Sequence, residues 1–169
     1  HYGRGGELFG AFRKPSQVRA IDGISVEVGV GETVAVVGES GSGKSTLARC
    51  IVGLLQPTGG HVKVAGQAVP RRPSAWPRQL RRKIQIVFQN PDRTLNPRRS
   101  VMEAVARPLA LFRIASRRTR RAAATRAFEA VGLSESHLDA YPGQLSGGQR
   151  QRIAIARAFA CRPELVVCD

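Results

Sequence analysis

One short stretch, Gly38 to Thr46, restricts the possible folds of this chain more than any other part of it. It spells Gly-Glu-Ser-Gly-Ser-Gly-Lys-Ser-Thr, so that glycines recur up to a lysine and a pair of hydroxyl side chains. The run before it, Thr33 to Val37, is apolar and β-branched and predicts a buried strand. The run after it, Leu47 to Leu55, predicts a helix. A glycine-rich loop between a strand and a helix indicates an α/β fold.

The chemistry that this stretch supports is the binding of phosphate. It fits G-x-x-x-x-G-K-[ST], the phosphate-binding loop of nucleotide triphosphatases. Its glycines let successive backbone N–H groups face phosphate oxygens, and the following helix turns its positive end to the same anion. We expect Lys44 to reach the β- and γ-phosphates and the Ser45 hydroxyl to bind Mg²⁺, which prefers oxygen ligands. The alternative is a glycine-rich turn that only caps a helix. The residues of this stretch expected to contact nucleotide are Gly38, Ser40, Gly41, Gly43, Lys44, Ser45 and Thr46.

The composition is that of a globular domain with an unusual charge. The 169 residues, 42% of them hydrophobic, suffice for one domain with a real core. Lysine and arginine number 27 against 12 acidic residues, a net charge of +15, which favours nucleic-acid binding. The arginines are scattered, however, and Trp76 is the only tryptophan, so a basic surface with interleaved aromatic residues is not indicated. We therefore expect an arginine-rich phosphate-binding protein with no nucleic-acid partner.

The apolar runs, the cysteines and the ends of the chain further restrict the class of protein. No apolar run approaches membrane-spanning length, and we expect no signal peptide. Cys50, Cys161 and Cys168 lie in apolar contexts without metal-ligand spacing, and we expect buried thiols in a reducing compartment. The chain begins with His1 and stops at Asp169, directly after an apolar run, so we expect a fragment cut at both ends.

Further strands are expected on both sides of the middle of the chain. Loose alternation over 18–28 predicts strands at a sheet surface, and 61–66 alternates as another strand. The runs 84–88 and 165–168 are short and apolar and predict buried strands.

The helices are expected mainly in the second half. One is predicted over 101–112, with Pro108 disturbing it, and one over 117–131 with Ser116 as its cap. A third begins at 145–149 and continues through Ala160. The arginines that open the second helix indicate a solvated face, with a site for an acidic partner as the alternative; they are Arg117, Arg118, Arg120 and Arg121.

Three further features combine with the phosphate loop. Asp169 ends an apolar strand, as a carboxylate must to reach Mg²⁺ through a water, and Gln89 follows another strand. Ser146 and the two glycines after it stand at the start of a helix and form a second anion site. Two such helix starts, roughly a hundred residues apart, suit one nucleotide only if two subunits face each other.

On these residues the chain resembles the ATP-binding cassette (ABC) ATPases. Residues 145–149, Leu-Ser-Gly-Gly-Gln, match the signature motif of that family letter for letter, and the family pattern continues through Ala158. Gln89 matches the glutamine of the Q-loop, and 165–169 matches the Walker B strand. The resemblance implies a P-loop NTPase (RecA-like) core with an N-terminal antiparallel β subdomain and an inserted helical subdomain, without the C-terminal strands of the sheet.

The resemblance also implies a site. ATP and Mg²⁺ are the expected cofactors, and ATP hydrolysis is the expected activity of the complete protein. The residues to which it gives catalytic roles are Lys44, Gln89, Ser146 and Asp169, and the metal contacts are Ser45, Gln89 and Asp169. The residues expected to contact a nucleotide held by a second subunit are Ser146, Gly147, Gly148 and Gln149. The aromatic residue expected to stack on adenine is Tyr2, with Phe9 and Phe12 as rivals.

Partners follow from the same resemblance. It implies a head-to-tail dimer with a second ABC ATPase subunit or half, integral membrane permease subunits and, indirectly, an extracytoplasmic substrate-binding protein. The implied location is peripheral, at the cytoplasmic face of the membrane. Residues 84–91 and 94–98, together with 20–25 and 38–41, resemble the oligopeptide/dipeptide/nickel importer branch, so the expected cargo is peptide or nickel.

Within 1–169, a partial ABC ATPase domain, we expect three parts. They are a β subdomain with the P-loop core over 1–90, a helical subdomain over 91–145, and the signature helix with the Walker B strand over 146–169. The catalytic glutamate, D-loop and switch histidine of the family come after the Walker B aspartate and are not in these residues. We therefore expect weak ATP binding and negligible hydrolysis from this fragment alone. The alternatives are a non-transport ABC ATPase acting on nucleic acid and an inactive nucleotide-binding fragment.

Overall fold

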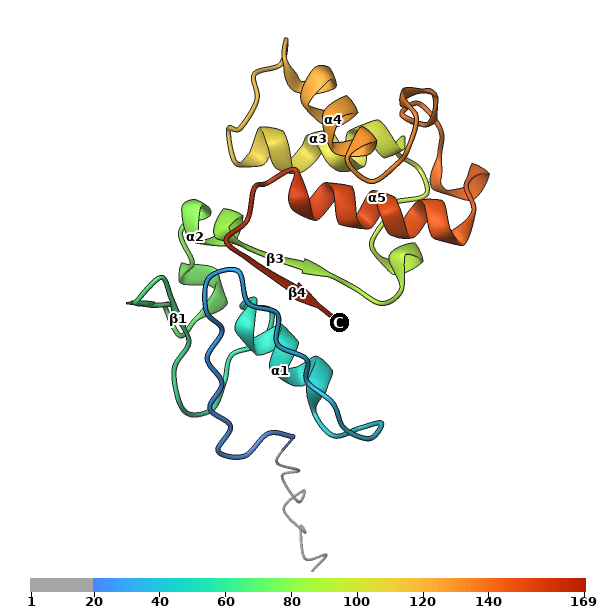
Figure 1. The fold of residues 1–169 in the computed structure, drawn as a ribbon. Coiled ribbons are helices and arrows are strands. Elements are labelled where there is room, and N and C mark those ends of the chain that lie inside the picture. Colours follow the sequence, from blue (N-terminus) through green and yellow to red (C-terminus); the bar gives the residue numbers. More distant parts are fainter. Residues whose placement is uncertain (1–19) are drawn as a thin grey trace, which may run out of the picture.

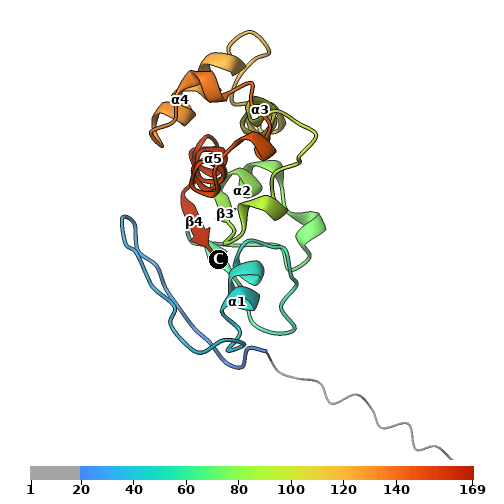
Figure 2. The same ribbon diagram turned by 90° about the vertical axis from the view of Figure 1, so that its right-hand side faces the viewer.

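The computed structural model describes residues 20–169 as a stack of layers (Figure 1). Two helices, α3 (Val101–Leu111) and α4 (Arg120–Glu129), lie above α5 (Gly147–Phe159), and α5 lies on a parallel pair of strands. Figure 2 shows α1 (Lys44–Ile51) on the other side of these strands. The sheet is thus placed between α5 and α1, the arrangement of an α/β fold.

The parallel pair consists of β3 (Ile84–Val87) and β4 (Leu165–Cys168). Ile84 lies opposite Leu165 and Val87 opposite Cys168, so the two strands end at the same edge. Both strands were predicted. β4 is only half-buried and Cys168 is exposed, because β3 is the one strand that pairs with β4 among the described residues.

A second pair, β1 (Lys63–Val64) and β2 (Gln67–Ala68), is antiparallel and short. Ala65 and Gly66 between the strands both have positive φ, 49° and 75°, as a two-residue hairpin turn requires. The strand predicted over 61–66 therefore ends at Val64, where the turn begins.

The prediction of strands over 18–28 and 33–37 is wrong for the described part of these ranges. Residues 20–43 contain no strand, and 89% of the Val37 surface is exposed. A buried strand needs a neighbour for its backbone N–H and C=O groups, but the ladders of the described residues join only β1 to β2 and β3 to β4. In Figure 2 the segment forms an extended loop beside the stack. Of the expected N-terminal antiparallel β subdomain, the described residues contain only β1 and β2.

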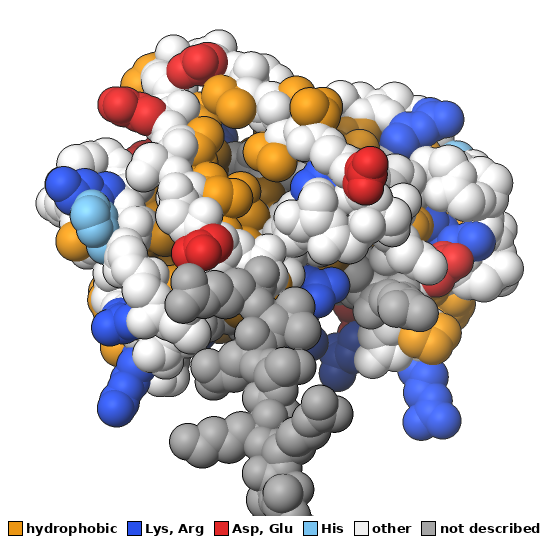
Figure 3. Space-filling view, turned by 90° about the horizontal axis from the view of Figure 1, so that it is seen from below, with side chains coloured by type: hydrophobic (Ala, Val, Ile, Leu, Met, Phe, Trp, Pro, Cys, Tyr) orange, Lys and Arg blue, Asp and Glu red, His pale blue; other side chains and the backbone are white. Residues whose placement is uncertain are grey.

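Apolar side chains are consequently open to solvent. Figure 3 shows hydrophobic side chains in a hollow on the face seen from below. The exposed large apolar residues of 20–43 are Ile24, Val26, Val28, Val30, Val34, Val36 and Val37.

The first helix begins and ends earlier than predicted. α1 spans Lys44–Ile51 rather than 47–55. Gly53, with a φ of 70°, follows its end. A Cβ at Gly53 would lie 2.7 Å from the ring of Trp76, so glycine is needed both for the turn and for this contact. Trp76 follows the short 3-10 helix Pro73–Ala75 and precedes α2 (Arg78–Lys83), which leads directly into β3.

The main hydrophobic core lies between α3, α4 and α5. α3 contributes Val101, Val105 and Leu109, spaced four apart and therefore on one face of the helix. Phe128 of α4 and Ile153 of α5 are fully buried against them. α3 continues through Pro108 to Leu111. Its buried apolar face and the capping box that Ser100 and Glu103 form at its start stabilise it.

α4 begins at Arg120, three residues later than predicted. Ser116 does not cap this helix. Its Oγ accepts a hydrogen bond from the Thr119 N–H at 3.2 Å, and Thr119 Oγ1 accepts one from the Ser116 N–H at 3.1 Å. The two residues satisfy each other in a turn before the helix.

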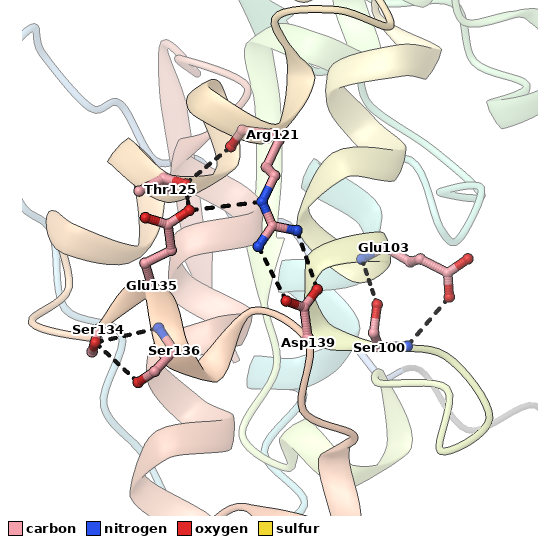
Figure 4. Close-up of polar contacts among 8 residues, drawn as sticks. All are labelled: Ser100, Glu103, Arg121, Thr125, Ser134, Glu135, Ser136 and Asp139. Atoms are coloured by element: carbon pink, nitrogen blue, oxygen red, sulfur yellow. Dashed lines mark hydrogen bonds and ion pairs between the residues drawn. The ribbon is translucent and has the colours of Figure 1, made fainter.

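An ion-pair cluster joins α4 to the segment that follows it (Figure 4). Arg121 donates to both carboxylate oxygens of Asp139, at 3.2 and 3.1 Å, and its Nε lies 3.7 Å from Glu135. The hydrogen bond from Arg121 lowers the pKa of the Asp139 carboxyl below its ordinary value. All three side chains are exposed, so the cluster fixes the position of the segment more than it adds stability.

The core assignment is tested by substituting Phe128. We expect Phe128→Ala to lower the free energy of unfolding by about 3–5 kcal/mol, because the ring is completely buried. Phe159→Ala is the matched control, because 55% of that side chain is exposed, and we expect a loss of less than about 1 kcal/mol. Denaturant unfolding followed by circular dichroism measures both. Equal losses would contradict the assignment.

Candidate functional site

The phosphate loop is shaped by two glycines with left-handed backbone. Gly41 has a φ of 84° and Gly43, the N-cap of α1, a φ of 96°. A Cβ at Gly43 would overlap the carbonyl oxygen of Ala20. Any other residue at this position would be strained and would also clash with backbone. The glycine of the motif is therefore required by the local structure.

Lys44 folds back over the loop that precedes it. Its Nζ donates to the carbonyl oxygens of Gly38 at 2.8 Å and Glu39 at 2.7 Å, and lies 3.4 Å from Ser42 Oγ. The first turn of α1 contains no acidic residue, and no side chain caps it. The loop thus presents an ammonium group and a helix N-terminus without a competing carboxylate, which suits an anion. Ser45 is exposed beside them.

Gln89 and Asp169 lie at one edge of the parallel sheet. β3 and β4 end in register, and the Asp169 N–H donates to the Val87 carbonyl at 2.9 Å, one residue beyond β4. Gln89 follows β3 and is exposed, while Asp169 is half-buried. Both ribbon views place the carboxyl terminus beside α1 (Figures 1 and 2). The structure therefore brings Asp169 to the side of the sheet on which the phosphate-loop helix lies.

The predicted metal ligands suit Mg²⁺ held jointly with a nucleotide. Residues 20–169 contain no cluster of three or more His, Cys, Asp or Glu that could hold a metal by itself. The predicted ligands Ser45, Gln89 and Asp169 offer a hydroxyl, an amide and a carboxylate oxygen, all hard donors. Mg²⁺ is commonly bound by one or two such groups together with substrate phosphates.

The second anion site is the start of α5. Ser146 is its N-cap, and a capping box joins Ser146 to Gln149. The Gln149 N–H donates to Ser146 Oγ at 3.2 Å, and the Ser146 N–H donates to Gln149 Oε1 at 2.8 Å. Ser146, Gly147 and Gly148 are exposed. The hydroxyl of Ser146 accepts within the box, which leaves its own proton available to an outside acceptor.

An open hollow connects this helix start with the end of β3. It is lined by the residues after β3, Gln89, Asn90, Pro91 and Asp92, and by Gly147, Gly148 and Gln151 of α5. Figure 1 draws the amino end of α5 on its right-hand side, with β3 and β4 pointing toward the same side. Gln89 and the glycines that open α5 therefore share one open hollow.

Two arginines of α5 that the sequence analysis did not single out hold the segment after β3. Arg150 pairs with Asp92, with 2.5 Å between Nε and Oδ1, and also donates to the carbonyl of Leu145. Arg157 donates to the Thr94 carbonyl at 2.7 Å, and burial lowers the pKa of its guanidinium. No local sequence pattern indicates the contacts with the segment after β3, because each joins residues that lie far apart in the chain.

Tyr2, Phe9 and Phe12, the candidates for stacking on adenine, lie outside the described residues.

The cysteines differ in environment. Cys161, after α5, is completely buried, and burial raises the pKa of its thiol to about 11. Burial also raises the pKa of the half-buried Cys50. Cys168 is exposed, contrary to expectation, because it ends β4, a strand that only β3 pairs with among the described residues.

The match to known families agrees with this geometry. The family model described as ABC transporter matches residues 21–169, and the chain belongs to this family. The P-loop NTPase fold class expected from the sequence is thereby confirmed, since solved cassettes of the family superimpose on the chain. A dimeric, post-hydrolysis structure of the cassette MJ0796 bound to ADP and Pi has a TM-score of 0.76 at 34% identity, over 89% of this chain and 65% of that one. The structure of cbiO1 from Clostridium perfringens, part of the ABC transporter complex cbiONQ, has a TM-score of 0.74 at 30% identity, covering 89% and 58%.

The curated relatives narrow the similarity further. The chain is 48% identical to the di/tripeptide transport ATP-binding protein DppF of Pseudomonas aeruginosa over 160 residues, 95% of this chain and 50% of that protein. It is 44% identical to the dipeptide transport ATP-binding protein DppF of Escherichia coli, covering 95% and 48%. The chain spans about half the length of these relatives. Across residues 20–169, no helix is both long and apolar enough to cross a membrane.

The cysteine environments predict an order of alkylation. At neutral pH we expect iodoacetamide to modify Cys168 first and to leave Cys161 unmodified in the folded protein, because Cys161 is inaccessible and its thiol is protonated. Peptide mass spectrometry measures both sites. The same reaction in denaturant is the control, and it should modify the two equally. Modification of Cys161 as fast as Cys168 in the folded protein would contradict the described burial.

Proposed function

We propose that this chain is the nucleotide-binding part of an ATPase subunit that powers a peptide importer. The observation that supports this most directly is the geometry of Lys44, whose ammonium group is placed over the loop by the carbonyls of Gly38 and Glu39. The relatives named as di/tripeptide and dipeptide transport proteins support peptide as the cargo. Nickel remains the second cargo suggested by the sequence resemblance.

Each site residue has a proposed role. The backbone N–H groups of the loop that contains Gly38, Ser40, Gly41 and Gly43 hold phosphates, while Thr46 supports the first turn of α1. Lys44 leaves its carbonyl partners and binds the β- and γ-phosphate oxygens as a charge-assisted donor. Mg²⁺, when bound, neutralises phosphate charge during hydrolysis. The residues proposed to hold it, directly or through water, are Ser45, Gln89 and Asp169.

The exposed start of α5 supports a head-to-tail dimer. Ser146, Gly147 and Gly148 are exposed, and within residues 20–169 none of them is hydrogen-bonded to the phosphate loop. We propose that they contact ATP held by a second subunit, aided by Gln149. Closing of the dimer on ATP and opening after hydrolysis would then move permease subunits in the membrane. The subunit would be peripheral at the cytoplasmic face, and Tyr2 would stack on adenine.

We propose a role for each of the three expected parts of the chain. We propose 1–90 as the nucleotide-binding core with its β subdomain, 91–145 as the helical subdomain that meets the permease, and 146–169 as the signature helix and metal-binding strand. The packing of α3, α4 and α5 around one hydrophobic core supports close mechanical contact between the second and third parts.

Nucleotide binding is tested by substituting Lys44. We expect Lys44→Ala to weaken ATP binding at least tenfold, because it removes charge-assisted hydrogen bonds worth about 1.5–3 kcal/mol. Lys63→Ala, at an exposed lysine of β1, is the matched control and should bind as the wild type does. Isothermal titration calorimetry measures both. Unchanged affinity in Lys44→Ala would remove the basis of the proposal.

The two-subunit site is tested at Ser146 in the complete protein. We expect Ser146→Arg to leave ATP binding unchanged and to reduce hydrolysis to background, because a long cation at this position blocks dimer closure. Ser74→Arg, at an exposed serine away from the site, is the control. Steady-state phosphate release and ATP titration measure the two quantities. Normal hydrolysis by Ser146→Arg would show that the site is not shared in this way.

A further inference from the structure

A chain of hydrogen bonds extends from the start of α5 to His137, to which the proposed function gives no role. Gln149 Nε2 lies 3.1 Å from His137 Nε2, and His137 Nδ1 lies 3.3 Å from the carbonyl oxygen of Ser134. His137 ends the short 3-10 helix Glu135–His137, twelve residues before Gln149. Both side chains are half-buried at this contact.

The roles of donor and acceptor in this chain follow from elementary chemistry. The Ser146 N–H can only donate, so the Gln149 atom 2.8 Å from it is the amide oxygen. The other end of the amide is then NH₂, which can only donate, and His137 Nε2 must accept. The proton of the neutral imidazole is therefore on Nδ1, where the Ser134 carbonyl can only accept. Every atom has one role that fits its partner.

From this geometry we infer that His137 is a positioning residue for the signature serine. By accepting from the Gln149 amide, it fixes which end of the amide faces Ser146. A proton or any other donor at His137 Nε2 would oppose the NH₂ group and turn the amide, which would present NH₂ to the Ser146 N–H and open the capping box. The Ser146 hydroxyl would then lose its fixed orientation.

The support under His137 is rigid enough for this role. Leu138 is completely buried, and its carbonyl accepts from the Met102 N–H at 2.8 Å. The Ala140 carbonyl accepts from the Val101 N–H at 2.9 Å. On the other side, Arg121 of α4 holds Glu135 and Asp139, as Figure 4 shows. The imidazole is thus carried by a segment that is tied to both α3 and α4, so the helical layer sets the orientation of Ser146.

The importance of this orientation rests on the proposed function, in which Ser146 contacts ATP held by a second subunit. The hydrogen-bond roles of His137 do not depend on that function and can be measured by themselves.

The test compares two substitutions in the complete protein. His137→Gln keeps a side-chain oxygen that can accept from Gln149, and we expect hydrolysis within about twofold of wild type. His137→Lys offers only donors, and we expect kcat to fall about tenfold with ATP affinity unchanged. Equal rates in all three proteins, or an equal fall in both variants, would overturn the inference, because either result would show that the acceptor is irrelevant.

A spectroscopic measurement decides the same point without nucleotide. Nitrogen-15 NMR of the histidine-labelled complete protein, with His137→Gln to assign the resonance, should show the neutral tautomer protonated on Nδ1. Protonation on Nε2 would overturn the inference. If His137→Lys hydrolyses normally while Lys44→Ala does not, the role of His137 falls and the proposed ATP site stands. If the wild-type protein does not hydrolyse ATP, the proposed function falls and the tautomer still decides the inference.

Discussion

The burial of α5 between the helical layer and the parallel sheet is the interaction on which the rest of the structure depends. Ile153 and Ala156 belong to the core shared with α3 and α4, while Ala154 and Ala158 are also buried in the same helix. Burial on several faces fixes both ends of a helix in space. At one end stands Ser146, and beyond the other the chain passes through Cys161 into β4 and Asp169. One packed helix therefore sets the relative positions of two groups that are proposed to act on different nucleotides.

Polar contacts then tie the segment after β3 to the same helix. Arg150 reaches Asp92, and Arg157 reaches the Thr94 carbonyl. Arg82 of α2 donates to the Cys161 carbonyl at 3.1 Å. These contacts join parts of the chain that lie far apart in sequence, so a displacement of the segment that contains Gln89 cannot leave α5 unaffected. Coupling of this kind is what a nucleotide-driven movement of attached subunits would need.

The sequence predicted those features that depend on local pattern. The phosphate loop, β3, β4 and the capped start of α5 follow from glycine positions, short apolar runs and a serine at a helix start. It did not predict that 33–37 lacks strand structure in the described chain, since an apolar run indicates burial but cannot say whether a pairing neighbour is present. It also missed Arg157 and His137, because a hydrogen bond to a carbonyl or amide across tertiary structure leaves no local pattern. The predicted start of α4 was three residues too early. Ser116 and Thr119 hydrogen-bond to each other in a turn, and the helix begins only after Thr119.

The contact between Gly53 and Trp76 has a practical consequence. Trp76 is the sole tryptophan of the sequence and is 7% exposed, and its indole N–H donates to the Pro70 carbonyl at 2.8 Å. Its ring lies against the backbone just beyond α1, whose other end is the phosphate loop. Indole emission depends on solvent access and on nearby backbone dipoles, so this residue is a built-in optical reporter of α1. Movement of that helix within this chain can therefore be followed in real time, without attaching a dye.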